Sequence, residues 1–197
     1  MIASVPRKTM TMGNKKMKRL IGACVILAGA MMLPLAGASA KNFNLAAFFG
    51  TFKGTGVSEN RDSIYFGTTV RDLDVTIHPA GKGFSIEWTT VIRRGGDPRN
   101  PKVRRKAQTM TFQPAGKGGA YRADGNGDLL SGQPYAWAYN RKDALVIHIM
   151  SVAESGAYEM QSYTRRIVPT GMEFTFERIR NDEPVRRVTG KLTKFSK

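Results

Sequence analysis

Apolar and polar residues alternate along most of the chain. Phe84, Ile86 and Trp88 are separated by single polar residues, and so are Phe174 and Phe176. A period of two residues is typical of a strand that buries one face. We therefore predict that these five side chains point together into one hydrophobic core.

Similar short runs recur through the chain, and no helical period longer than one turn appears after residue 49. The runs occupy residues 49–58, 63–78, 84–92, 103–112, 135–139, 144–150, 158–168, 172–177 and 185–195. Gly, Pro, Asn and Asp cluster between them, which is typical of turns. About nine or ten short strands with short connections predict an all-β fold, namely a single antiparallel up-and-down β-barrel. A β-sandwich is the main alternative, and the segment 42–49 is predicted to form a short N-terminal helix.

The first 40 residues have a different composition. They contain six basic residues and no acid, followed by an apolar run from Leu20 to Leu35 and by the small residues of the segment 38–40. This order is typical of a secretory signal peptide that is cleaved after Ala40. The alternative is a retained anchor helix, but the run is shorter than the roughly 20 residues that span a bilayer. We expect a signal peptide over 1–40, a barrel domain over 41–197 and a periplasmic location.

Charge and cysteine content limit the partners. The chain has 31 Lys and Arg against 15 Asp and Glu, a net charge of +16, with one Cys and two His. A Cys-rich zinc site and a disulfide framework are excluded, and two isolated His give no metal-ligand spacing. The charge predicts an anionic partner. Nucleic acid fits the charge, but the export signal argues against it.

The segment 50–56 (GTFKGTG) follows the expected helix directly. It resembles the opening strand of the calycins, the lipocalin-like barrels, and especially the nitrobindin-type branch. The resemblance implies a ten-stranded barrel with an internal cavity. That branch binds haem through a His near its last strand, but the segment 180–187 contains no His, so we predict no cofactor. In lipocalins an Arg of the last strand lies against the aromatic residue of the opening motif. Arg186 or Arg187 would take that place beside Phe52.

Aromatic residues and one His supply a candidate cavity lining. The tyrosines and tryptophans among them carry polar groups that suit an amphipathic ligand. The alternative is an ordinary filled core, in which the His is buried and neutral. The candidates are Trp88, Tyr135, Trp137, Tyr139, His148, Phe174 and Phe176.

A second candidate site is strongly basic. The segment 93–106 holds seven basic residues and one acid, and its Gly and Pro residues predict a hairpin loop. Arg binds phosphate through two parallel hydrogen bonds, so the segment is a candidate anion-binding rim. A solvated loop without a ligand is the alternative. The basic residues are Arg93, Arg94, Arg99, Lys102, Arg104, Arg105 and Lys106.

No catalytic motif is present: the sequence contains no Gly-x-Ser-x-Gly, no Gly-rich phosphate loop and no His-Glu-x-x-His. We therefore predict a non-catalytic binding protein for an amphipathic or apolar ligand. Its basic rim would face anionic lipid or an envelope polymer. Two alternatives stay open, an envelope interaction protein with a filled barrel and an isomerase or cyclase that acts in a barrel cavity.

Overall fold

The computed structural model describes residues 43–61, 67–93, 97, 99–116 and 118–196. Almost all regular structure in this part of the chain is β-strand. The signal peptide expected over 1–40 lies outside the described residues. The elements are η1 Leu45–Phe48, β1 Gly50–Asn60, β2 Thr68–Ala80, β3 Gly83–Arg93, β4 Val103–Pro114, β5 Ala120–Ala123, η3 Leu129–Ser131, β6 Tyr135–Arg141, β7 Ala144–Val152, β8 Tyr158–Val168, β9 Gly171–Arg180 and β10 Glu183–Ser196.

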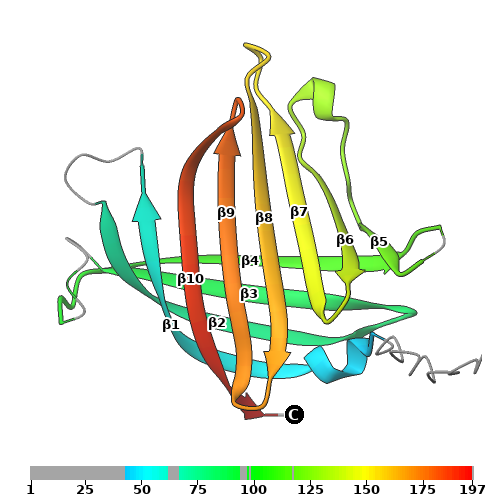
Figure 1. Cartoon of the computed structure of the whole chain (residues 1–197). Coiled ribbons are helices and arrows are strands. Elements are labelled where there is room, and N and C mark those ends of the chain that lie inside the picture. The colour runs from blue at the N-terminus through cyan, green and yellow to red at the C-terminus, as the bar shows by residue number, and fades with distance from the viewer. Residues whose placement is uncertain (1–42, 62–66, 94–96, 98, 117, 197) are drawn as a thin grey trace, which may run out of the picture. The chain divides into compact units, whose positions relative to one another are not determined.

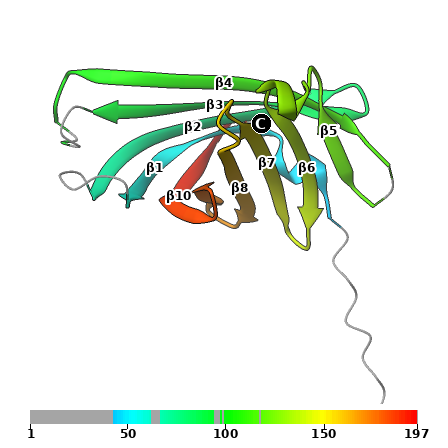
Figure 2. The ribbon, with the colours of Figure 1, turned by 90° about the horizontal axis from the view of Figure 1, so that it is seen from above.

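The strands close into one antiparallel up-and-down barrel. Each strand pairs with the next in sequence, and β1 also pairs with β10. Figure 1 shows β7 to β10 across the front and β2 to β4 behind them, and Figure 2 shows the two walls from above. Closure pairs the first strand with the last, so neither is left as a free edge. The ten-stranded barrel confirms the predicted fold class, and the sandwich alternative is excluded.

The predicted inward face of β3 is correct. Phe84 and Ile86 are fully buried, Trp88 is 8% exposed, and Phe174 on β9 is also buried. Phe176 is partly buried and packs against the same core. Phe84 also stacks on a Phe of β4 with ring centroids 5.1 Å apart. Alternation along β3 and β9 therefore predicted the inward side chains of these two strands correctly.

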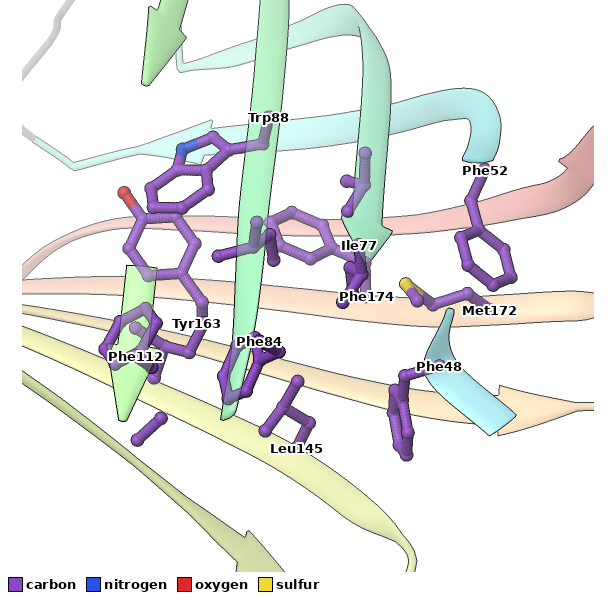
Figure 3. Packing of buried hydrophobic residues seen from close by; sticks show 14 of the residues in the cluster. Phe48, Phe52, Ile77, Phe84, Trp88, Phe112, Leu145, Tyr163, Met172 and Phe174 are labelled. Carbon is purple, nitrogen blue, oxygen red and sulfur yellow. The ribbon is translucent and has the colours of Figure 1, made fainter. Parts of the chain in front are cut away.

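The predicted N-terminal helix is a single 3-10 turn. Asn44 begins it, because its side chain accepts a hydrogen bond from the backbone N–H of Ala46 at 3.0 Å. Phe48 is 2% exposed and belongs to the barrel core. Figure 3 shows it near Phe52 and Met172. The turn thus covers one end of the core with an aromatic side chain.

The glycines of the segment 50–56 allow close packing across the barrel. Gly56 on β1 pairs with Gly190 on β10. A Cβ atom would lie 2.8 Å from the Leu73 Cδ1 atom at Gly56 and 3.0 Å from it at Gly190. Leu73 is 4% exposed. The Leu73 side chain therefore packs against the backbone of both glycines, and it would have to shift to admit a Cβ atom at Gly56.

The Arg expected beside Phe52 is replaced by another cation. The Lys194 Nζ atom lies over the Phe52 ring, 5.5 Å from its centroid. Arg186 instead donates to the side chain of Asn60 at 2.5 Å, and Arg187 lies opposite another residue of β1. The reason is the antiparallel register. Arg186 and Arg187 lie near the start of β10, which pairs with the end of β1, whereas Phe52 lies near the start of β1.

Candidate ligand-binding cavity

A cavity of about 500 Å³ lies inside the barrel. Its lining comes from β2, β3, β4, β8, β9 and β10. Its volume is within the range of small-molecule binding sites, which is about 300–1,000 Å³. The barrel is therefore hollow enough to accept a ligand.

Aromatic side chains from three strands form much of the cavity wall. Tyr163 on β8 lies at the centre of this group, with its ring centroid 5.1 Å from that of Trp88 and 4.8 Å from that of Phe176. Figure 3 shows the rings of Trp88 and Tyr163 against each other, with Phe174 nearby. Such a wall offers apolar surface to a ligand.

Arg165 lies deep in this wall. It is 0% exposed, and it sits between Leu145 and Phe174 in the sheet register. Its guanidinium carbon lies 5.5 Å from the ring centroids of Trp88 and Phe174 and 5.4 Å from that of Tyr163. Burial lowers the pKa of Arg165 to about 10, so the side chain stays cationic at neutral pH.

The guanidinium of Arg165 has no hydrogen-bond partner among the described residues. All three of its nitrogens, Nε, Nη1 and Nη2, are buried and unpaired there. A buried charge without hydrogen bonds is costly, and such groups are usually paired. The cation–π contacts compensate the charge but leave the N–H groups unsatisfied. Arg165 therefore brings three unpaired donors to the cavity wall, where neighbouring side chains cover them, so an anion has to displace those side chains to reach the donors.

The rest of the cationic lining forms a group of mutually repelling side chains. The pKa of Arg71 is lowered to about 10, first by burial and then by repulsion from Arg186 and Arg104. The pKa of Lys106 is lowered by burial and by four neighbouring Arg side chains. Asp74 is the single acid among the described lining residues. The cationic lining residues are Arg71, Arg105, Lys106, Arg165, Arg178 and Arg186.

A hydrogen-bonded chain orders one side of the lining. The Tyr163 hydroxyl donates to Gln161 at 2.8 Å, and the Gln161 amide donates to Glu159 at 2.8 Å. Glu159 also forms ion pairs with Arg178 and, at 3.3 Å, with Arg180. Burial raises the pKa of Glu159, but the hydrogen bonds from Arg178 and Gln161 outweigh burial and leave the pKa below its ordinary value. Arg178 is therefore a cation whose charge is already compensated.

Three of the seven predicted cavity residues line the cavity: Trp88, Phe174 and Phe176. The other four are not among the residues that line this cavity. On β6 it is Ala136 and Ala138 that are buried in the core. The aromatic residues that alternate with these alanines are half-buried on the outward face. The four residues outside this lining are Tyr135, Trp137, Tyr139 and His148.

His148 has an ordinary environment on that outward face. Its Nδ1 atom lies 2.8 Å from the Ser162 hydroxyl oxygen, and its Nε2 atom lies 3.4 Å from the Tyr139 hydroxyl oxygen. Burial lowers the pKa of His148. Its ring also packs against that of Trp137 at 5.0 Å. The described residues contain no group of three or more His, Cys, Asp and Glu that could hold a metal ion.

The predicted basic rim divides into three parts. Arg105 and Lys106 line the cavity, and Arg104 lies close enough to lower the pKa of Lys106. Arg93 forms an ion pair with an Asp of β2. Arg99 and Lys102 are exposed in the connection between β3 and β4. Arg94 lies outside the described residues.

Sequence reasoning missed the deepest cation. Tyr163, Arg165 and Ile167 alternate along β8 on its inward face, which carries Gln161 and Glu159 nearer the start of the strand. A charged residue between two inward-facing apolar residues was the available signal. Its meaning depends on which face points inward, and a weakly alternating strand does not decide that.

No family model matches this chain, and no curated protein matches it. The resemblance to the calycins therefore stays a prediction, since a closed barrel is shared by unrelated proteins. Within the residues described, no helix is both long and apolar enough to cross a membrane.

Proposed function

We propose that this protein is a non-catalytic binding protein that holds an amphipathic ligand with an anionic group inside its barrel. The observation that carries the proposal is the Arg165 side chain, fully buried at the cavity with three nitrogens that lack partners among the described residues. A carboxylate or phosphate oxygen would accept from these nitrogens, and the aromatic wall would contact the apolar part of the ligand.

Two features favour binding over proton-transfer catalysis. Burial raises the pKa of Tyr163 to about 12, and the pKa of Arg165 is about 10. Both groups keep their protons at neutral pH, whereas a general acid or base works best with a pKa near the working pH. The open volume of about 500 Å³ favours a bound ligand over a barrel that acts through its outer surface alone.

The proposal includes export of the protein and contact of its basic rim with an anionic surface. The basic start, apolar run and small residues of the segment 1–40 support a periplasmic location. The exposed cations Arg99, Lys102 and Arg104 support contact of the rim with anionic lipid or an envelope polymer. A ligand taken up from such a surface would enter the cavity past Arg105 and Lys106. These two residues belong to its cationic lining.

Fluorescence titration tests the proposal. In a Trp137→Phe background, Trp88 is the sole tryptophan and reports on the cavity. We expect dodecanoate to change this fluorescence at lower concentration than dodecanol, the uncharged analogue of equal length. Arg165→Met should weaken dodecanoate binding about tenfold or more, since a hydrogen bond to a charged group contributes roughly 1.5–3 kcal/mol. It should leave dodecanol binding unchanged.

Arg166→Met is the matched control, because Arg166 is the next residue of β8 and is exposed. It should preserve the preference for dodecanoate. Equal affinity for dodecanoate and dodecanol in the unmodified cavity would contradict the proposal, and so would an equal loss in both Met variants.

A further inference from the structure

We propose that the ligand of this cavity carries two anionic groups joined by an apolar segment, one held by Arg165 and the other by Arg71 and Lys106. The inference rests on the proposed function and specifies the ligand class. It follows from the distribution of charge along the cavity, which is cationic at two levels and aromatic between them.

The sheet register separates the two levels. On β8 and β9, Arg165 pairs with Phe174, and Gln161 pairs with Arg178. The two pairs are four residues apart, which corresponds to about 13 Å along a strand. Arg178 lies close enough to Lys106 to lower its pKa, so Lys106 belongs to the level of Arg178; it is exposed there, whereas Arg165 is fully buried. A ligand that touches both levels therefore extends along the barrel from its interior to its opening.

The wall between the two levels is apolar. Tyr163, Phe176 and Val188 belong to the lining, and they lie between the level of Arg165 and that of Arg178 in the register of β8, β9 and β10. Trp88 faces them from β3 with its ring beside that of Tyr163. Such a wall suits a hydrocarbon segment and offers it little hydrogen bonding.

Arg71 and Lys106 supply the second anion site. They lie on β2 and β4, and both line the cavity. The Arg71 Nη2 atom donates to the Asn60 side chain at 3.5 Å, whereas its Nε atom is buried and has no hydrogen-bond partner in the described part of the chain. Both groups have lowered pKa values, caused first by burial and then by neighbouring cations such as Arg104. An anion between them would relieve this repulsion, whereas Arg178 already has Glu159 as its partner.

Isothermal titration calorimetry with dodecanedioate and dodecanoate tests this inference. The two probes have the same chain length and differ in one terminal carboxylate. We expect the diacid to bind about tenfold more tightly, although it is less hydrophobic. The double variant Arg71→Gln with Lys106→Gln should remove this advantage and leave dodecanoate affinity within about twofold.

Arg141→Gln with Lys191→Gln is the control for charge. These residues are also one Arg and one Lys, and neither belongs to the described cavity lining. The control should retain the diacid advantage. Urea unfolding of both double variants checks that each is folded.

The outcomes separate the two proposals. A diacid that binds no better than the monoacid overturns the two-anion inference, while an Arg165-dependent dodecanoate affinity still supports the proposed function. Equal weakening of both probes by the double variant at Arg71 and Lys106 also overturns it. Arg71 and Lys106 would then attract any anionic ligand through their charge and would not bind the second carboxylate specifically. Binding of neither probe overturns both proposals.

Discussion

The guanidinium carbon of Arg165 lies 5.5 Å from the centroid of the Trp88 ring, inside the barrel. Tyr163 and Phe174 approach the same guanidinium at 5.4 and 5.5 Å. A cation over an aromatic face gains about 0.5–2 kcal/mol, so three rings make a buried charge tolerable. The rings hold the cation but accept no hydrogen bond from its three nitrogens, which lack partners among the described residues.

Replacement of Arg165 by Met should not destabilise the ligand-free protein. The unpaired guanidinium costs desolvation energy, and apolar replacements of buried ions are often neutral or stabilising by about 1–4 kcal/mol. Urea unfolding of the two proteins gives the comparison. A loss of several kcal/mol would mean that Arg165 is a structural element of the core, and its assignment to a ligand would be abandoned.

Glu159→Gln should destabilise the protein by about 1.5 kcal/mol near neutral pH, because it removes the carboxylate that accepts a charged hydrogen bond from the partly buried Arg178. The pKa of Glu159 is lowered in the folded state, so its contribution is present above the unfolded pKa and is lost as pH falls through the folded pKa. The difference between the two proteins should therefore shrink below about pH 4. Glu177→Gln is the control, since its pair with Arg187 is exposed and 3.8 Å long. If both substitutions lowered the free energy of unfolding equally, the Glu159–Arg178 pair would contribute no more to stability than an exposed pair.

Acidification should weaken the fold through His148. Burial lowers its pKa in the folded state, so the unfolded chain binds a proton first as pH falls, and the free energy of unfolding decreases. We expect His148→Gln to reduce the loss of stability between about pH 7 and about pH 5, as urea midpoints would measure. His78→Gln, at an exposed ring on β2, should keep the slope of the parent. An unchanged slope in His148→Gln would show that other groups cause the acid sensitivity.

The rim residues Arg99, Lys102 and Arg104 should contribute to binding on anionic vesicles. Co-sedimentation should fall as salt rises, because the screening length decreases from ~10 Å at 0.1 M to ~3 Å at 1 M. Replacing all three by Gln should reduce binding while stability changes by less than about 0.5 kcal/mol.

The charge-matched control for the rim replaces Arg122, Arg141 and Lys191, which are exposed on other strands. It should bind vesicles more strongly than the rim variant. If the two triple variants bind equally, only total charge matters and the rim has no specific role.

The sequence by itself determined the fold class and part of the core. Strict alternation in the segments 84–88 and 172–177 fixes which residues share a face, and turn residues separate successive strands. The large side chains of Phe84, Ile86 and Trp88 gain most from burial, so the inward face of β3 follows from hydrophobicity alone. The same reasoning predicts a barrel, because many short antiparallel strands need closure.

Only the tertiary structure decided which face of β6 points inward. Ala136 and Ala138 are inside, while Tyr135 and Trp137 are outside, the reverse of what side-chain size suggests. The reason is packing: the large residues of β7, including Leu145 and Ile147, already fill that part of the core and leave space for alanine alone. The closed barrel likewise brought Arg165 against Trp88, 77 residues earlier in the chain. Their contact depends on the closure of the barrel, which a local sequence pattern does not encode.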